Sequence, residues 1–388
     1  MADEYSEVSS ESWFGRIGDS IKGILFGIIL IPLAVLLLSW NEGRAVTTAK
    51  SLKEGAGTVV SVEASPIFPA NEKKLVHVNG EATTTDFVSD PIFAISAPAI
   101  RLSRTVEMYQ WKENEKSETT KKLGGGTETV KTFSYEKTWS KELIDSSKFK
   151  HRDQHANPGG MLAQNFTIAA PHVMLGAFKV PTSVIRKMNG DEVIAPSDAD
   201  LAKLNPDLKS KAKLADNGFY FGSDPSAPTV GDQRVTFKVL KPAVFSVLAQ
   251  QIGDTFAPYP TQAGREIERV ESGTISATAM FQHAASENAM LTWGLRVLGF
   301  IVMSLGIGLI LNPISVFGDV IPFLGSILGT GVALASIMLG MAGSLITIAV
   351  AWFVVRPVLS GTLLALALAS LLFGRYFGSR RAAATKTS

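Results

Sequence analysis

Two histidines that lie four residues apart form the only stretch of this sequence with the spacing of a metal site. They are His151 and His155, in the sequence His-Arg-Asp-Gln-His. On a helix, two histidines at this spacing share one face and can bind one metal ion. However, Asn157-Pro158-Gly159-Gly160 follows at once and disfavours a helix. We therefore expect a capped loop whose histidine packs or hydrogen-bonds, and its possible functional residues are His151, Asp153, His155 and Asn157.

Other signatures of catalysis or cofactor binding are absent from the sequence. The chain has no cysteine, which excludes disulfides, thiolate metal sites and cysteine nucleophiles. It has no G-x-S-x-G, H-E-x-x-H or dinucleotide fingerprint. Its net charge of +2 gives no reason to expect nucleic acid as a partner. We predict a protein that is not an enzyme, with no cofactor and no metal. A ligand-binding or hydrolytic domain that uses the His151–Pro158 loop remains the alternative.

The first apolar segment, Gly23 to Trp40, has 18 residues and no charge. At about 1.5 Å per residue, a helix of this length nearly matches a hydrocarbon core of about 30 Å. A cleavable signal peptide is the competing interpretation, but five acidic residues precede the segment and Ser39–Glu42 is a poor cleavage site. We predict a retained membrane span at 23–40.

Three more spans are predicted near the C-terminus. The second occupies 291–311, and the charge-poor stretch after Phe323 is long enough for two helices that meet at Arg356-Pro357. We place these at 329–355 and 357–374. The intervening segment, 312–328, is apolar but interrupted by two prolines, so we expect it in the membrane interface with Asp319 facing water.

The charges of the termini predict the topology. The tail, 375–388, is basic without an acidic residue, which favours the cytoplasm. Four spans would place both termini there and residues 41–290 outside the cytosol. Residues 1–22 then form a cytoplasmic tail, where the spacing of Trp13, Ile17 and Ile21 suggests an interfacial helix and a disordered tail is the alternative. The expected interfacial tryptophans are Trp13, Trp40, Trp293 and Trp352.

Small residues recur every four positions in the predicted C-terminal spans. They are Gly325, Gly329, Ser336, Gly340, Ser344, Gly361, Ala365 and Ala369. Such faces let helix backbones approach closely, either within one chain or in a homo-oligomer. Arg296 lies about one turn inside the second span, and no predicted span carries a carboxylate or histidine. A transporter or channel, with a polar path near Arg296, is therefore only an alternative.

Residues 41–290 are predicted to form an α+β domain rich in antiparallel sheet. Period-two alternation predicts strands at Thr58–Glu63, Leu75–Thr83 and Arg234–Val239, and a hairpin from Arg104–Trp111 and Thr129–Trp139. Its glycine-rich tip, Lys121–Gly126, lacks the spacing of a phosphate loop. Helices are expected at Pro181–Met188, Asp198–Leu214 and Pro242–Gln251. Thr274–Phe281 alternates like a strand, and a helix is expected from Ala284 into the second span.

Several of these segments resemble the LUMA (transmembrane protein 43) family. The resemblance is carried by Trp40–Val46, Arg104–Trp111, Trp139 with Phe149, His155, Asn157 and Pro158, Gly231–Val235, and Trp293–Arg296. It spans most of the chain, and Val-Glu-Met-Tyr-Gln-Trp at 106–111 is its most specific part.

The resemblance implies four spans, a large lumenal or periplasmic domain, and no catalytic residue. Animal members are described as organisers of complexes at the inner nuclear membrane and endoplasmic reticulum that self-associate and bind emerin and lamins. We expect a bacterial inner-membrane source, where emerin and lamins do not exist, so those partners are not transferred. The prediction is a membrane scaffold whose partners are membrane lipid, further copies of the chain, and unidentified membrane or extracytoplasmic proteins.

Overall fold

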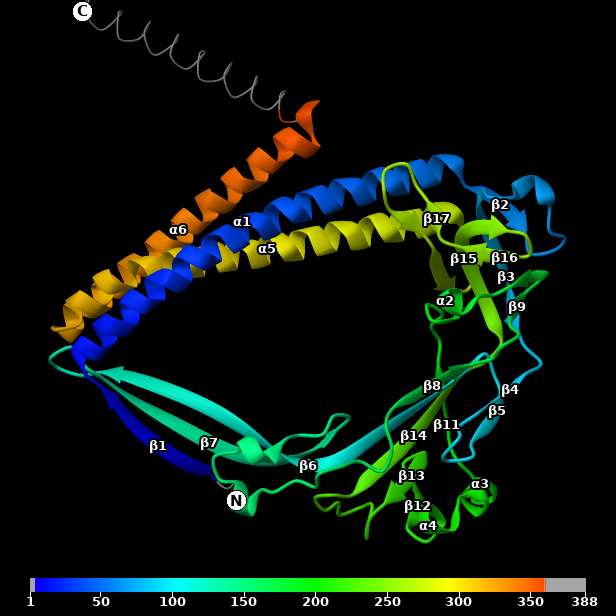
Figure 1. Cartoon of the computed structure of the whole chain (residues 1–388), viewed down its shortest axis with the longest axis horizontal. Coiled ribbons are helices and arrows are strands. Elements are labelled where there is room, and N and C mark those ends of the chain that lie inside the picture. Colours follow the sequence, from blue (N-terminus) through cyan, green and yellow to red (C-terminus); the bar gives the residue numbers. More distant parts are fainter. Residues whose placement is uncertain (1–3, 359, 361–388) are drawn as a thin grey trace, which may run out of the picture. The chain divides into compact units, whose positions relative to one another are not determined.

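A computed structural model of the chain describes residues 4–358 and residue 360 (Figure 1). Within these residues the chain forms two compact units. The first, which we call the sheet unit, contains residues 4–9, 51–118 and 129–283. The second, the helical unit, contains residues 10–50, 119–128 and the residues after 283.

The larger sheet of the sheet unit has eight strands, in the order β1-β7-β6-β14-β13-β12, with β8 paired to β6 and β11 to β14. Its strands are β1 (Glu4–Glu11), β6 (Arg101–Lys121), β7 (Thr127–Ser140), β8 (Phe166–Ala169), β11 (Glu192–Ile194), β12 (Ala212–Ala215), β13 (Gly218–Phe221) and β14 (Gln233–Leu240). The pairs β6–β14, β13–β14 and β12–β13 are antiparallel, as the alternating pattern predicted.

The second sheet has seven strands, in the order β19-β15-β16-β10-β9-β3-β2, with β15 also paired to β3. Its strands are β2 (Val60–Glu63), β3 (Leu75–Thr83), β9 (Met174–Leu175), β10 (Phe178–Lys179), β15 (Ala243–Ile252), β16 (Thr255–Ala257) and β19 (Arg269–Ser272). Two small ribbons pair β4 (Phe87–Ser89) with β5 (Ser96–Pro98) and β17 (Tyr259–Pro260) with β18 (Glu266–Ile267). Short helices are α2 (Thr182–Ile185), α3 (Asp198–Lys203) and α4 (Pro206–Lys209), and 3-10 turns are Pro69–Asn71, Ser146–Lys148 and Arg152–Gln154.

One hydrophobic core joins the two sheets. Val76 and Val78 of β3 and Phe245 of β15 lie in the same buried cluster as Phe237 of β14. Three buried rings pack edge to face or stacked around Phe93, whose centroid is 5.9 Å from that of Phe237. Each fully buried side chain of this size contributes about 1.5–3 kcal/mol. The core explains why the two sheets fold as one unit.

The sequence predictions for this unit were confirmed where alternation was long. The strand predicted at Leu75–Thr83 has these bounds, and Arg234–Val239 lies inside β14. The hairpin is present but longer, because β6 extends back to Arg101 and forward to the tip. At the tip, Gly124 and Gly125 adopt the left-handed backbone (φ +86° and +80°), which makes the segment the turn that the sequence predicted.

Three predictions were wrong here. Pro242–Gln251 is the strand β15 and not a helix, because β3 and β19 pair with both of its edges. Asp198–Leu214 breaks into α3 and α4 at Asn205-Pro206 and then enters β12. Thr274–Phe281 is not a strand, since α5 already begins at Ala277.

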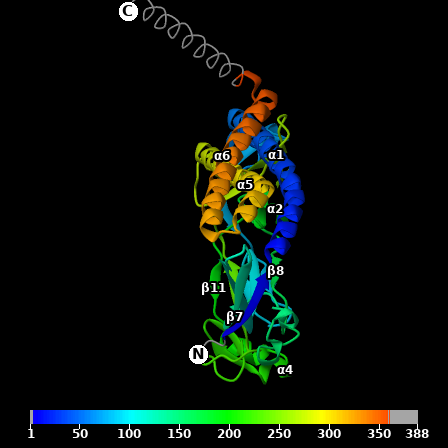
Figure 2. The same ribbon diagram turned by 90° about the vertical axis from the view of Figure 1, so that its left-hand side faces the viewer.

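The helical unit is built from three long helices: α1 (Trp13–Thr58), α5 (Ala277–Gly318) and α6 (Pro322–Val355). Each is long and apolar enough to cross a membrane. α1 and α5 run side by side, and α6 turns back from the end of α5 (Figure 1, Figure 2). Their exposed side chains between the ends are almost all aliphatic or aromatic, as hydrocarbon requires.

These helices correct several predicted boundaries. α1 begins at Trp13, so the expected interfacial helix and the span at 23–40 are one continuous helix. The predicted interfacial segment, 312–328, is instead divided between the end of α5, which continues through Pro313, and the start of α6. Asp319 does not face water, because it is fully buried. The fourth predicted span, 357–374, lies almost wholly outside the described residues.

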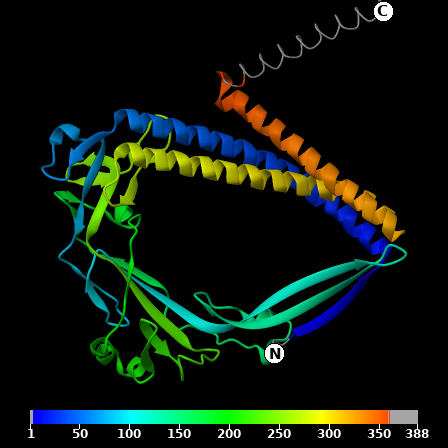
Figure 3. The same ribbon diagram turned by 180° about the vertical axis from the view of Figure 1, so that it is seen from behind.

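The N-terminal residues also differ from the expected tail. β1 is the edge strand beside β7 (Figure 3). The Ser6 Oγ lies 3.3 Å from the Thr132 Oγ1. The Lys150 Nζ forms an ion pair with Glu7 at 3.1 Å. Paired strands share one compartment, so this pairing bears on the predicted layout, with 1–22 on one side of the membrane and 41–290 on the other. That layout stays a prediction.

Candidate functional site

The polar residues of the hairpin base form a network inside the sheet unit. The Arg104 guanidinium donates to both carboxylate oxygens of Asp90, at 2.8 and 2.7 Å, and both side chains are buried. The Arg234 Nε donates to the Glu107 Oε2 at 2.7 Å, and its guanidinium covers the Trp139 ring. These bonds join β6 to its neighbours. They hold strands together.

Asp232 fixes the turn that precedes β14. Its carboxylate accepts hydrogen bonds from the Tyr220 hydroxyl at 2.6 Å and from the Thr229 backbone N–H at 2.8 Å. Burial and the adjacent carboxylate raise the pKa of Tyr220. The Tyr220 hydroxyl therefore stays protonated and donates, which makes it a structural group.

The side chains of the predicted functional loop are also engaged in hydrogen bonds that hold the structure together. The Asn157 side chain accepts from the Trp111 backbone N–H at 2.8 Å and donates to the Trp111 and Ile144 carbonyls. The His155 Nδ1 lies 2.8 Å from the His151 carbonyl, and because a carbonyl only accepts, this nitrogen carries the proton. The His155 ring is fully buried and stacks on Tyr135 at 3.7 Å. Asp153 is exposed.

A tyrosine that the sequence did not single out lies at the centre of this loop. The Tyr135 hydroxyl donates to the Glu113 carboxylate and accepts from the His151 backbone N–H. Burial, followed by the effect of Glu113, raises the pKa of Tyr135 to about 12. The His151 ring stacks on Tyr5 of β1 at 3.9 Å. The loop thus fastens β1, β6 and β7 to one another.

The loop does not assemble the ligands of a metal ion. Among residues 4–358 and 360, no group of three histidine, cysteine, aspartate or glutamate side chains could hold one. His151 and His155 are separated by the 3-10 turn Arg152–Gln154 and face different rings. The structure therefore offers no support for the hydrolytic alternative at this loop.

In the helical unit, a buried ion pair joins all three helices at one end. Glu42 of α1 accepts from the Arg296 Nε at 2.7 Å and from a second Arg296 nitrogen at 2.9 Å. The Trp352 Nε1 of α6 donates to the same carboxylate at 2.8 Å. The Glu42 side chain is 0% exposed. We call Glu42, Arg296 and Trp352 the first end cluster.

Neighbouring polar residues extend this cluster along α1 and α5. The Asn41 Nδ2 donates to the Thr292 carbonyl at 3.0 Å. Arg44 donates to the Asn288 Oδ1 at 2.8 Å and to the Thr292 Oγ1 at 2.9 Å. Most of these residues lie in the two segments, Trp40–Val46 and Trp293–Arg296, that carry the family resemblance. Sequence reasoning missed Glu42 as a buried carboxylate because the hydropathy of the first span ends at Trp40.

A second polar cluster lies at the opposite end of the helices. Asp319, after α5, accepts from Arg16 of α1 at 2.5 Å and from the Lys121 Nζ of the hairpin tip at 2.6 Å. Arg16 also donates to the Gly125 carbonyl, and the Trp13 Nε1 donates to the Val316 carbonyl at 2.9 Å. We call Arg16, Lys121 and Asp319 the second end cluster. From Arg16 to Glu42, α1 rises about 39 Å, somewhat more than a hydrocarbon core of about 30 Å.

The predicted interfacial tryptophans divide into two kinds. Trp40 and Trp293 are 58% and 64% exposed beside the first end cluster, and the Arg296 guanidinium lies over the Trp293 ring at 4.7 Å. Trp13 and Trp352 instead donate hydrogen bonds within the helical unit. Trp40, Trp293 and Trp352 thus gather at one end of the helices.

Several small residues of α6 lie against α5. A Cβ on Gly340 would collide with Ser304, and one on Gly329 would lie 3.0 Å from the Ser315 Oγ. Gly325 packs against Asp319, and Ser336 and Ser344 are buried. Gly329 and Gly340 thus allow α6 to approach α5 closely. Gly361, Ala365 and Ala369 lie outside the described residues.

The fold and the two end clusters define a membrane protein that has, among its described residues, three apolar helices and a large domain rich in antiparallel sheet. The chain belongs to the transmembrane protein 43 family: the family profile "Transmembrane protein 43" matches residues 108–357. The chain is 32% identical to Transmembrane protein 43 of Mus musculus over 386 residues, which covers 96% of this chain and 95% of the mouse protein.

Other relatives extend from human to fly. Transmembrane protein 43 of Homo sapiens is 32% identical over 95% of this chain and 93% of its own length. The "Transmembrane protein 43 homolog" of Drosophila melanogaster is 28% identical over 88% of this chain and 90% of its own length. No solved structure shows a significant match to the chain.

Proposed function

We propose that this chain is a non-enzymatic membrane scaffold that self-associates and binds partner proteins through its sheet unit. One observation carries the proposal: the polar residues that mark the family are engaged in bonds between helices and strands. Glu42 with Arg296, Arg104 with Asp90, and the Asn157 clamp each join separate elements. Such residues maintain a shape, which is what a scaffold presents to its partners.

The fourth span at 357–374 and a cytoplasmic tail belong to this proposal. They are supported by the apolar composition of 358–373 and the basic residues after it. The location in a bacterial inner membrane rests on the expected source. For a eukaryotic source, the endoplasmic reticulum and inner nuclear membrane take its place.

The two remaining alternatives gain no specific support. A transporter near Arg296 would need an ionisable group that is open to a solute path. The Arg296 guanidinium is instead paired with a buried carboxylate. The side chains of the His151–Pro158 loop are engaged in structural hydrogen bonds and ring contacts, which gives the ligand-binding or hydrolytic alternative no specific support.

The test is to cross-link the full chain in its native membranes and to determine masses after gentle extraction. We expect multiples of 41.5 kDa, or defined partner proteins bound to the chain. A single monomer band with no bound partner, at every cross-linker concentration, would contradict the proposal.

A matched pair of variants tests which surface self-associates. Gly331 of α6 has nothing within 4 Å of its Cβ position, whereas Lys213 lies in β12 at the open end of the larger sheet. Gly331→Leu should leave the oligomer intact. Lys213→Pro, which removes a backbone donor from the edge strand, should weaken it. The reverse pattern would assign self-association to the helices.

A further inference from the structure

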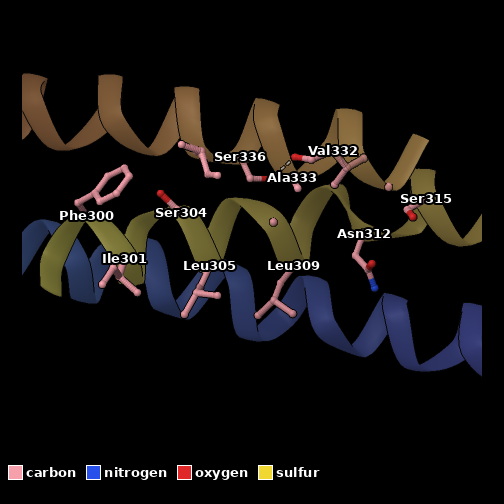
Figure 4. A pocket seen from close by; sticks show the side chains of 13 residues that line it. Phe300, Ile301, Ser304, Leu305, Leu309, Asn312, Ser315, Val332, Ala333 and Ser336 are labelled. Carbon is pink, nitrogen blue, oxygen red and sulfur yellow. Dashed lines mark hydrogen bonds between the residues drawn. The ribbon is translucent and has the colours of Figure 1, made fainter. Parts of the chain in front are cut away.

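A groove lies between α5 and α6 in the helical unit. It has a volume of about 590 Å³ and is lined by Phe300, Ile301, Leu305 and Leu309 of α5 and by Val332 and Ile337 of α6, with smaller and polar side chains between them (Figure 4). Ile301, Leu305 and Ile337 are each more than 40% exposed, so the groove opens on the outer surface of the helices. Because the surrounding exposed side chains are apolar, hydrocarbon is the medium that surrounds this opening.

The size of the groove fits a single alkyl chain. Its lining runs from Phe300 to Ser315 along α5, which corresponds to about 22 Å of helix. This is about three quarters of the thickness of a hydrocarbon core of about 30 Å. The volume also lies inside the range of about 300–1,000 Å³ that is usual for small-molecule sites.

One end of the groove is polar and carries a net positive charge. Asn312 and Ser315 line this end, together with Gly329 of α6. A Cβ on Gly329 would lie 3.9 Å from the Lys121 Nζ, so this ammonium group reaches the groove. Asp319 is shared by Lys121 and Arg16, and these two cations with one carboxylate leave one positive charge.

The Lys121 side chain remains 34% exposed, whereas Asp319 is fully buried. The ammonium can therefore bind another anion while it keeps its ion pair, since an ammonium group has three donors. The adjacent Lys122 and Glu128 form an ion pair with each other, so they add no net charge at this end of the groove.

We propose that this groove binds a membrane phospholipid, with one acyl chain between α5 and α6 and the phosphate at Lys121. An amphiphile with an anionic head and an alkyl tail matches the order of the lining, from the cationic end to the apolar floor. The occupant comes from the bilayer itself. The binding of lipid does not depend on the scaffold role proposed above, so each can fail without the other.

The experiment uses the purified full chain in phosphatidylcholine vesicles that contain a small fraction of a photoreactive lipid. One probe is phosphatidylglycerol with a diazirine in its acyl chain, and the other is phosphatidylcholine with the same chain. After irradiation, labelled peptides are mapped by mass spectrometry. We expect several-fold more labelling of 300–315 and 329–337 with the phosphatidylglycerol probe, above the labelling of the exposed Met338 and Val350.

Two pairs of variants separate the tail from the head. Ala333 lines the groove and Ala342 is an exposed residue outside it. Ala333→Trp should reduce groove labelling several-fold, and Ala342→Trp should not. Lys121→Ala should abolish the preference for phosphatidylglycerol and Lys121→Arg should retain it. The matched control is Lys116→Ala, which alters an exposed lysine of the same strand.

Two outcomes would overturn the proposal. Equal labelling of all exposed residues of α5 and α6, unchanged by Ala333→Trp, would indicate ordinary contact with bulk lipid. Protection of 300–315 and 329–337 from both probes would show that protein fills the groove, either residues beyond Ser360 or a second copy of the chain.

Discussion

Glu42 is a buried carboxylate directly after the apolar stretch of α1, and three hydrogen-bond donors explain why it is tolerated there. Two come from Arg296 and one from the Trp352 indole. A buried ion pair contributes little net stability by itself, but removal of one partner leaves a buried charge and costs about 3–5 kcal/mol. The pair therefore makes the contact of α1 with α5 and α6 specific.

We expect Glu42→Gln to destabilise the chain by about 3–5 kcal/mol, since the Arg296 charge would remain buried without its counterion. The matched control is Asp19→Asn on the same helix, whose pair with Lys22 is exposed to solvent and should contribute little to stability. Unfolding in mixed micelles with increasing SDS measures both. Equal losses in the two variants would contradict a buried pair, and Arg296→Gln should recover part of the loss when added to Glu42→Gln.

Tyr135 gives a prediction of how the free energy of unfolding depends on pH. Because its pKa is raised to about 12 in the folded chain, from an ordinary value near 10, the protonated form is favoured by folding. This stability is fully present below pH 10 and is lost as the pH rises through 12. Tyr135→Phe should remove that part of the pH dependence, and the free energy of unfolding, measured from pH 9 to 12, is the readout. If the free energy of unfolding of the Tyr135→Phe variant changed with pH as steeply as that of the original chain, the pH dependence would be assigned to lysines.

At this scale the sequence identified the loop residues but not their roles. The loop could be singled out because His151 and His155 lie four residues apart, the spacing of a metal site on a helix. Tyr135 and Glu113 meet the loop only through pairing of β6 with β7, and Lys121 meets Asp319 across 198 residues. No local spacing reports such contacts, so a single sequence could not predict them.

Among the helices and strands, the predictions succeeded where apolar and polar residues alternate over many positions. β3 and the hairpin alternate over many residues, and both were predicted. Pro242–Gln251 contains the short apolar run Val-Phe-Ser-Val-Leu-Ala, which fits a buried strand or a helix equally well. Its strand conformation is fixed by backbone bonds to β3 and β19, which are distant in sequence.

α1 packs closely against α5 where Gly27 faces Gly306. A Cβ on Gly27 would lie 2.5 Å from the Gly306 carbonyl oxygen, whereas nothing lies within 4 Å of the Cβ position of Gly43. Gly27→Ala should therefore separate the helices and destabilise the chain by about 1–3 kcal/mol. Gly43→Ala should be neutral or stabilising by up to about 1 kcal/mol. SDS unfolding of both variants is the test, and equal stability would exclude the close approach.

β1 is an element that no periodicity predicted, because Glu-Tyr-Ser-Glu-Val-Ser-Ser-Glu is polar on both faces. Its pairing can be trapped, since the chain has no cysteine of its own. Ser6→Cys with Thr132→Cys should form a disulfide, given hydroxyls 3.3 Å apart. Ser6→Cys with Ser140→Cys is the control. Failure of the first pair under oxidising conditions, with free thiols confirmed, would count against the strand.

For the whole molecule, the pairing of β1 changes what hydropathy alone suggested. Apolar runs predicted four spans, and three helices of suitable length are present among the described residues. The same reasoning assigned the two ends of α1 to opposite sides of the membrane. However, residues 4–9 and 51–118 belong to one compact unit, in which β1 and β6 are strands of one sheet. Hydropathy carries no information about such long-range pairing.

Single cysteines can test this consequence directly. Ser6 lies in β1, and Gly253 lies in the turn between β15 and β16 with open space at its Cβ position. Because both belong to the sheet unit, Ser6→Cys and Gly253→Cys should react with a membrane-impermeant maleimide from the same side of sealed vesicles. Ser388→Cys marks the side of the basic tail. If Gly253→Cys reacted from outside and Ser6→Cys only after permeabilisation, β1 would not pair with β7 in the membrane, and residues 1–22 and 41–290 would lie on opposite sides.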